Sequence, residues 1–197
     1  MTTLMVMLHG YGSNGDDLLS LAPYFEKFIP DIKFYGPNGV QPSELGIYGY
    51  QWFSLADRSP SYINTGLESG TPEIRSLIEK KAAELGVSQE NIILLGFSQG
   101  ATVASYLALS ADKPYKAVIG FSGWVFCPKN IRNTKTPICL IHGTEDDIVP
   151  SANQKDSKKL LEDLGCTVSS TLIENLAHSI DLKGLEFAAN FIKSLED

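Results

Sequence analysis

Ser98 lies in the pentapeptide GFSQG (residues 96–100), between an apolar run and a run rich in small residues. A nucleophilic serine is typically held at a sharp turn from a strand into a helix. Glycines two positions to either side let the strand and the helix approach closely. The pentapeptide alone is a weak signal, but its place directly after the apolar residues 91–97 strengthens it. We therefore predict that Ser98 is a nucleophile.

Three histidines are candidates for the base that a serine hydroxyl needs at neutral pH: His9, His142 and His178. Where a nucleophile sits on this kind of turn, the base follows it in the chain, which excludes His9. His142 ends an apolar run as Ile-His-Gly, where a side chain more often supports a loop. His178 follows the last expected strand and precedes the last expected helix, so it is the predicted base.

The acid that orients the imidazole is expected in the run Glu145-Asp146-Asp147. An acidic run is usually a solvated turn, but this one lies between an apolar strand and a helix, at the same sheet edge as Ser98. We choose Asp146, with Asp147 as the alternative. The acid would hold the imidazole in the right tautomer and stabilise its charged form.

A tetrahedral intermediate also needs N–H donors for its oxyanion. One is the amide of Gln99, which begins a helix, where the N–H groups and the helix dipole favour negative charge. A second is expected from the loop HGYG (residues 9–12) after the first strand, where glycines let N–H groups turn inward. Such a loop can also bind a nucleotide phosphate, but its spacing matches neither a P-loop nor a dinucleotide fingerprint.

Short apolar runs that alternate with amphipathic segments must position these residues. The runs are mostly apolar throughout, as in parallel strands covered on both faces. Strands are predicted over 4–8, 32–36, 91–97, 116–122, 137–143 and 168–174. Helices are predicted over 16–28 with a kink at Pro23, over 71–86 with Thr71 as cap and Pro72 as first residue, and over 99–110, 152–165 and 184–196. This alternation predicts one α/β domain over 1–197, with a mostly parallel sheet and helices on both faces.

One stretch, residues 37–66, shows no clear periodicity and contains Gly, Pro and Ser. A long irregular segment inside a compact domain is often functional. Its rings can pack over a sheet edge or form an apolar wall beside a substrate, and both interpretations can hold together. We expect this segment to lie over the active site. Its aromatic residues are Tyr48, Tyr50, Trp52, Phe53 and Tyr62.

The net charge of −7 argues against a nucleic-acid binder, which usually has a basic face, and gives no reason to expect attraction to anionic lipid. The odd number of cysteines, Cys127, Cys139 and Cys166, lacks paired spacing and suggests neither a disulfide framework nor a zinc site. The apolar run at the N-terminus is too short for a signal peptide or a membrane span. We expect a cytoplasmic protein without a transmembrane segment.

Five motifs occur in order: LHGYGSN, GFSQGA, FSGW, HGTEDDIVP and AHSI. Together they resemble the phospholipase/carboxylesterase family of α/β hydrolases, which includes acyl-protein thioesterases and small bacterial carboxylesterases. The resemblance extends from residue 4 to residue 192. It implies an α/β-hydrolase fold with the nucleophile at Ser98, the acid at Asp146 and the base at His178.

The resemblance also implies that the amides of Tyr11 and Gln99 bind the oxyanion, and that Trp52 and Trp124 lie near the substrate groove. The chain departs from the family pattern at SGWVFCPKN (residues 122–130), where SGWLP is usual. No metal or cofactor is expected.

The implied function is a serine hydrolase that cleaves carboxylic esters or thioesters through an acyl-enzyme. Small esters, lysophospholipids and acyl-thioesters are all candidate substrates, and a homodimer is left open. One alternative is a lactonase of the dienelactone hydrolase type, although such enzymes normally carry Cys as the nucleophile. Another is a non-catalytic ligand-binding relative, which would usually lack part of the triad or the oxyanion loop.

Overall fold

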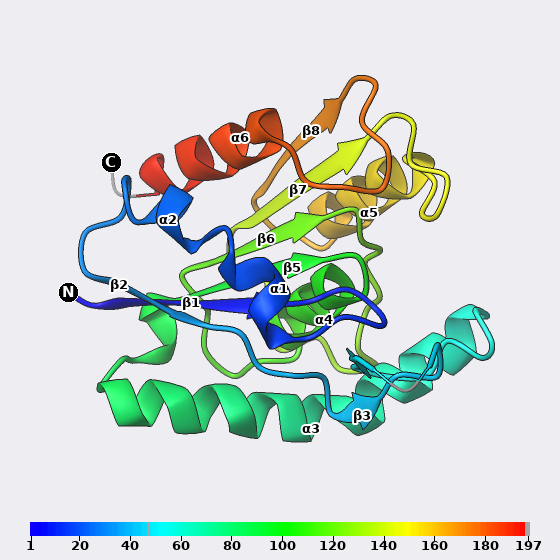
Figure 1. The fold of residues 1–197 in the computed structure, drawn as a ribbon, viewed down its shortest axis with the longest axis horizontal. Helices are drawn as coiled ribbons and strands as arrows, with labels where there is room; N and C mark the ends of the chain where they lie inside the picture. The colour runs from blue at the N-terminus through cyan, green and yellow to red at the C-terminus, as the bar shows by residue number, and fades with distance from the viewer. Residues whose placement is uncertain (47, 196–197) are drawn as a thin grey trace.

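The computed structural model describes residues 1–46 and 48–195, which fold around a six-stranded sheet. All neighbouring strands in this sheet are parallel, in the order β2-β1-β5-β6-β7-β8 (Figure 1). The predicted strands are all present, with ends displaced by one residue at most. Their bounds are β1 (Thr3–Leu8), β2 (Ile32–Tyr35), β5 (Ile92–Phe97), β6 (Ala117–Phe121), β7 (Ile138–Gly143) and β8 (Val168–Ile173).

Helices cover both faces of the sheet, which explains the continuous apolar runs. Along β1, Leu4 and Val6 belong to one buried cluster, whereas Met5 and Met7 belong to the other. The first face is covered by α3 (Pro60–Leu85), α4 (Gln99–Leu109) and α5 (Ala152–Asp163). The second is covered by α1 (Gly15–Leu19), α2 (Ala22–Phe25) and α6 (Leu182–Lys193) (Figure 1). The predicted fold class is confirmed.

The chain changes direction across the sheet between β1 and β5. From β1 it adds β2 on one side, and from β5 onward it adds β6, β7 and β8 on the other. In open α/β sheets, ligands bind at the carboxyl ends of the strands at such a switch point. The loop after β1 and Ser98 after β5 both lie at this place.

The helix predicted over 71–86 begins earlier than expected, because α3 starts at Pro60 and contains Pro72 in its interior. An interior proline costs a helix about 3 kcal/mol. A buried apolar stripe continues across the proline and offsets that cost. The stripe consists of Ile63, Leu67, Ile74 and Ile78.

Residues 60–66 of the segment predicted to be irregular are therefore helical. The remaining part, 37–59, contains one short antiparallel pair among its described residues, β3 (Gln41–Pro42) with β4 (Tyr50–Gln51). The segment also joins the loop after β1, because Ser13 and Tyr50 form an isolated bridge.

The helix predicted over 16–28 is broken into α1 and α2, and Pro23 lies in the first turn of α2. A proline is tolerated in a first turn, where its missing N–H has no partner in any case. The remaining helices match α4, α5 and α6, although α6 starts at Leu182 and ends at Lys193. Residue 196 of that prediction lies outside the described residues.

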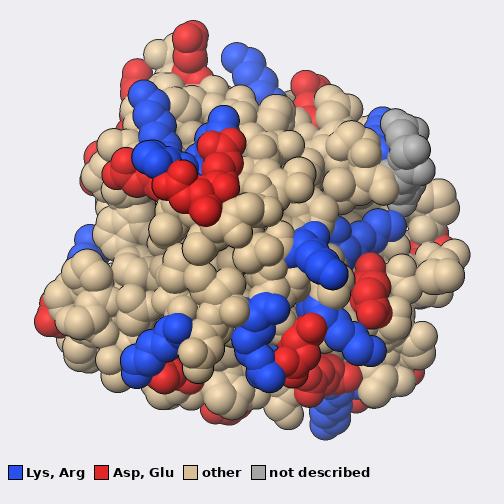
Figure 2. All heavy atoms as spheres, turned by 180° about the vertical axis from the view of Figure 1, so that it is seen from behind, with Lys and Arg blue, Asp and Glu red and all other residues tan. Residues whose placement is uncertain are grey.

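The sequence contains 23 acidic and 16 basic side chains. On the face shown in Figure 2, the two kinds are interspersed around uncharged surface. Within residues 1–46 and 48–195, no helix has both the length and the apolar character needed to cross a bilayer.

Candidate active site

Ser98 occupies a strained turn between the end of β5 and the start of α4. Its backbone has a φ of 54° and a ψ of −116°, which a residue with a side chain rarely adopts. The Ser98 amide donates to the Phe121 carbonyl at 2.8 Å and anchors the turn to β6. A Cβ at Gly100 would collide with the Leu8 carbonyl, so only glycine lets α4 approach this closely. Such a turn is typical of a serine nucleophile.

The structure brings His178 and Asp146 into direct contact. Nδ1–H of His178 donates to Oδ2 of Asp146 at 2.7 Å. The Asp146 side chain is completely buried, whereas 16% of the His178 side chain is exposed. Asp147, the alternative acid, is exposed to solvent. A proton on Nδ1 leaves Nε2 of the neutral ring as the atom that can take a proton.

Backbone amides hold the Asp146 carboxylate from its other side. Oδ1 accepts from the amides of Ile148 at 3.0 Å and Val149 at 2.8 Å. Burial opposes ionisation of Asp146, but the Val149 amide, His178 and the Ile148 amide together outweigh it. The pKa of Asp146 therefore lies below its ordinary value, and the carboxylate is charged at neutral pH.

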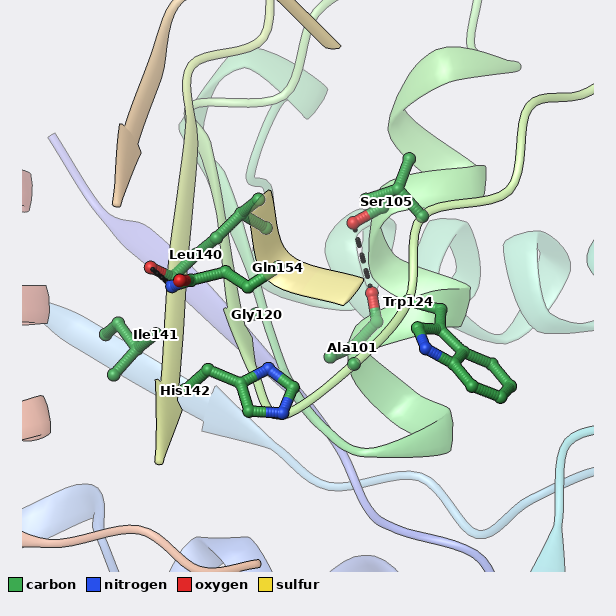
Figure 3. Close-up of a pocket in the computed structure, with 10 residues that line it drawn as sticks. Ala101, Ser105, Gly120, Trp124, Leu140, Ile141, His142 and Gln154 are labelled. Atoms are coloured by element: carbon green, nitrogen blue, oxygen red, sulfur yellow. Dashed lines mark hydrogen bonds between the residues drawn. The ribbon is translucent and has the colours of Figure 1, made fainter. Parts of the chain in front are cut away.

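His142 contacts the same carboxylate, which the sequence did not indicate. Its Nε2 lies 2.8 Å from the Val149 carbonyl and 3.1 Å from Oδ2 of Asp146. Because a carbonyl oxygen only accepts, the proton is on Nε2. Figure 3 shows the ring pointing from the end of β7 toward Ala101, where it lines a cavity of about 10 Å³. His142 thus supports the loop that carries Asp146, as the sequence interpretation expected.

Tyr11 and Gln99 have backbone amides without a hydrogen-bond partner among the described residues. In the part of the chain that the structure describes, neither the Tyr11 nor the Gln99 amide has an acceptor. Both residues line the same cavity as Ser98. Gly12, with a φ of 82°, turns the loop after β1, and its amide donates to the Tyr50 carbonyl at 2.9 Å. The 37–59 segment therefore helps to hold the loop that contains Tyr11.

The His9 ring fixes that loop from inside the protein. Nδ1–H donates to the Gly10 carbonyl at 2.7 Å, and Nε2 accepts from the Gly39 amide at 2.9 Å. Burial lowers the pKa of His9, and the hydrogen bond to Gly10 opposes this only in part. The two bonds together require a neutral ring with its proton on Nδ1.

Trp52, which the family resemblance implies to lie near the substrate groove, is buried behind the loop that contains Tyr11. None of its side chain is exposed, and it is absent from the described residues that line the cavity with Ser98. A buried indole N–H needs an acceptor, and Trp52 Nε1–H donates to the His9 carbonyl at 2.8 Å. The aromatic residues of the sequence segment do not show which rings line the cavity and which are buried behind it.

The side chain of Gln99 joins α4 to the 37–59 segment. Oε1 accepts from the Trp52 amide at 3.0 Å, and Nε2 donates to the Phe53 carbonyl at 2.7 Å. Sequence reasoning gave Gln99 a role only through its backbone. A large polar residue at the start of an otherwise apolar, small-residue helix was the available signal.

Ser98, His178 and Trp124 line one cavity of about 320 Å³, near the lower end of the ~300–1,000 Å³ typical of ligand pockets. The Trp124 amide donates to Oγ1 of Thr102 at 3.2 Å, which holds this tryptophan against α4. The cavity wall is mainly apolar. It includes Phe53, Leu55, Ile63, Phe97, Phe126 and Ile148. Sequence reasoning did not single out Leu55, Ile63 or Ile148, because nothing local marks them as lining residues.

Among the described residues, no group of three or more His, Cys, Asp and Glu side chains is arranged to hold a metal ion. The fold, together with a serine at the switch point and a histidine–aspartate pair beside it, places the protein among the α/β hydrolases.

The sequence profile of the phospholipase/carboxylesterase family matches residues 1–196, and the chain belongs to that family. It is 26% identical to the esterase YpfH of Escherichia coli over 96% of this chain and 82% of that protein. It is 30% identical to acyl-protein thioesterase 1 of Saccharomyces cerevisiae over 96% and 91%.

The crystal structure of esterase PE8 has a TM-score of 0.92 and 34% identity, covering 98% of this chain and 93% of that one. The predicted family and the predicted class of enzyme, a serine hydrolase of carboxylic esters or thioesters, are confirmed by these matches.

Proposed function

We propose that Ser98, His178 and Asp146 form the catalytic triad of this hydrolase, and that the amides of Tyr11 and Gln99 bind the oxyanion. The observation that carries the proposal is one cavity that holds a strained Ser98, a histidine bonded to a buried carboxylate, and two unpaired amides. Each of these parts supplies one requirement of acyl transfer.

In the proposed mechanism, Nε2 of His178 takes the Ser98 proton as Oγ attacks the carbonyl carbon. The carbonyl oxygen becomes an oxyanion that the two amides stabilise, and Asp146 stabilises the protonated imidazole. The C–O or C–S bond then breaks, and His178 gives its proton to the leaving alcohol or thiol. A water, deprotonated by His178, attacks the acyl-serine, which releases the carboxylic acid and restores Ser98.

The apolar wall of the cavity supports substrates with an apolar group on one side of the scissile bond. Relatives named as an esterase and as acyl-protein thioesterases support carboxylic esters and thioesters as the two substrate classes. Lysophospholipids fall within the same chemistry, because they too present a carboxylic ester beside an apolar chain.

The test is hydrolysis of p-nitrophenyl esters from acetate to laurate, with an octanoyl thioester measured in parallel. We expect turnover by the wild type and a loss of about 10⁴-fold or more in kcat for Ser98→Ala. Ser69→Ala removes an exposed hydroxyl from α3 and should leave kcat unchanged. Equal rates for the wild type and Ser98→Ala would overturn the proposal. The chain length with the highest kcat/KM measures the depth of the cavity.

We further propose that residues 1–197 form one domain that works in the cytoplasm, which the three free cysteines Cys127, Cys139 and Cys166 support. Fractionation of cells that express the chain checks the compartment, and limited proteolysis checks the domain. A homodimer stays a prediction, which sedimentation at several protein concentrations measures.

A further inference from the structure

The cavity that holds Ser98 adjoins a second hollow. The second hollow has a volume of about 390 Å³ and lies between the start of α3 and α5, where Pro60, Asp156 and Leu160 line it. Three residues line both: Arg58, Trp124 and Phe126. A substrate that extends from the reacting carbonyl toward α5 would therefore lie beside these three residues, of which Arg58 alone is charged.

Arg58 brings a positive charge to a mainly apolar wall. Among the described residues that line the two hollows, it is the one Lys or Arg. It is exposed, and no carboxylate of the described chain forms an ion pair with it. A guanidinium without a protein partner presents its N–H donors in the fork that suits a carboxylate or a phosphate.

Two acidic residues of the 37–59 segment, which also contains Arg58, accept hydrogen bonds from other residues. Glu44 accepts from the hydroxyl of Tyr11 at 2.9 Å. Asp57 accepts from the amide of Ser59 at 2.7 Å and from its hydroxyl at 3.0 Å. Asp156 lines the second hollow as well, and no ion pair joins it to Arg58 among the described residues. Arg58 therefore has no ion-pair partner among the described carboxylates, and Asp156 is the one acidic residue among the described residues that line the hollows with it.

The charge of Arg58 also affects the side chain of Tyr11, whose amide is a proposed oxyanion donor. Burial and Glu44 raise the pKa of the Tyr11 phenol, and the positive charge of Arg58 lowers it in part. The field of Arg58 therefore reaches a side chain that lines the same cavity as Ser98. The protein as a whole carries a charge of −7, so attraction of an anion to this cavity depends on this local cation.

We propose that Arg58 is a specificity-determining residue that binds a carboxylate or phosphate group carried by the substrate, at the point where the two hollows meet. The substrate class is then an ester or thioester with an apolar chain and an anionic group. This inference rests on the proposed function. The anionic group belongs either to the acyl half or to the leaving half of the substrate, and the two are separated by experiment.

The first arm compares mono-p-nitrophenyl adipate with p-nitrophenyl hexanoate, which places the charge on the acyl half. The second compares lysophosphatidate with the monoacylglycerol of the same acyl chain, which places it on the leaving half. In the arm whose substrate carries the charge on the correct half, we expect Arg58→Gln to lower kcat/KM for the anionic substrate about tenfold or more. The kcat/KM for the neutral substrate should stay within about twofold of the wild type. Arg58→Lys should keep part of the preference for the anionic substrate, because lysine retains the positive charge but lacks the paired N–H donors of the guanidinium.

The matched control is Arg132→Gln, which removes an exposed arginine that pairs with Asp112 and lines neither hollow. It should leave both substrate ratios unchanged. Because Arg58 is exposed, the preference should also shrink as ionic strength rises, a response that a purely structural role would not give. The inference is overturned if Arg58→Gln slows anionic and neutral substrates equally, or if the wild type prefers the anionic substrate in neither arm.

Binding to an inactive variant separates this inference from the proposed function. Octyl phosphate is titrated into Ser98→Ala and into Ser98→Ala/Arg58→Gln by calorimetry, with octanol as the neutral reference. We expect the second protein to bind octyl phosphate about tenfold more weakly and octanol equally well. Equal binding of octyl phosphate by the two proteins would refute the role of Arg58. Turnover of neutral esters that depends on Ser98 would in that case still support the catalytic proposal.

Discussion

The turn at Ser98 and the 37–59 segment both line the cavity, but they are held in place by different means. Glycines two positions from Ser98 and short backbone contacts fix the turn. The 37–59 segment is fixed by side chains far away in the sequence, since His9 binds the Gly39 amide and Gln99 binds Trp52 and Phe53. The position of Ser98 is thus fixed by residues close to it in the sequence, whereas the 37–59 part of the cavity wall is held by hydrogen bonds from distant residues. Substitutions in each region should therefore differ in what they damage.

The largest effect is expected for Asp146→Asn, which should affect chemistry more than folding. Asparagine keeps the size of the side chain but offers a neutral group to His178, so the imidazole loses the partner that fixes its tautomer and its charge. We expect kcat to fall by about 10⁴-fold. Asp147→Asn changes an exposed neighbour and should alter kcat by less than about twofold. Similar losses in both variants, measured with p-nitrophenyl butyrate, would contradict the assignment of the acid.

An alanine in place of a glycine at the Ser98 turn should lower the free energy of unfolding more than the same change in the 37–59 segment. Gly100→Ala would place a Cβ against the carbonyl of Leu8, and neither backbone can give way without breaking the approach of α4 to the sheet. We expect the free energy of unfolding to fall by at least about 3 kcal/mol in urea denaturation. Gly46→Ala in the 37–59 segment meets open space and should stay within about 0.5 kcal/mol of the wild type. A larger loss for Gly46→Ala would reverse the comparison.

The link between the two regions is tested by Gln99→Ala. The variant retains the Gln99 amide but leaves the Trp52 amide and the Phe53 carbonyl without their buried partners. We expect a loss of about 1–3 kcal/mol in the free energy of unfolding, together with a higher KM for long-chain esters as the wall loosens. Gln89→Ala removes a half-buried side chain that donates to the Lys113 carbonyl, far from the cavity lining, and should have little effect on either quantity. An unchanged KM in Gln99→Ala would show that the wall keeps its shape without this link.

The sequence predicts the fold well because parallel strands buried on both faces are continuous apolar runs. The six strand predictions depended on this local property, and so did the turn at Ser98. Helix α3 was predicted incompletely, because Thr71-Pro72 resembles a helix start although Ser59-Pro60 is the real one. Only burial of the stripe that crosses Pro72 decides between them, and burial is a tertiary property.

The candidate site divides in the same way. The pairing of Asp146 with His178 could be predicted from the order of strands, since both residues follow strands that end at one sheet edge. The buried position of Trp52 could not, because it depends on a bond to the His9 carbonyl, 43 residues away. The contact between His142 and Asp146 was also missed, since a loop of uncertain shape separates the two in the sequence.

The smallest effect concerns pH and the support that His9 gives to the 37–59 segment. Burial holds the pKa of His9 below 6.5 in the folded protein, whereas the unfolded chain takes up the proton near that value. As pH falls below about 6.5, the unfolded state therefore binds more protons than the folded state, and the free energy of unfolding decreases. The stability that depends on neutral His9 is present above this pH and is lost progressively below it.

His9→Gln removes this titration while His142 and His178 remain in both proteins, so their contributions cancel in the difference. We expect the variant to be less stable at neutral pH, because the Gly39 amide loses the ring nitrogen that it binds. We also expect its free energy of unfolding to depend less steeply on pH between about 7 and 5. Urea denaturation at several pH values measures both quantities. Equal slopes in the two proteins would mean that the Gly10–Gly39 support tolerates a charged ring, and that the segment is held mainly by Gln99.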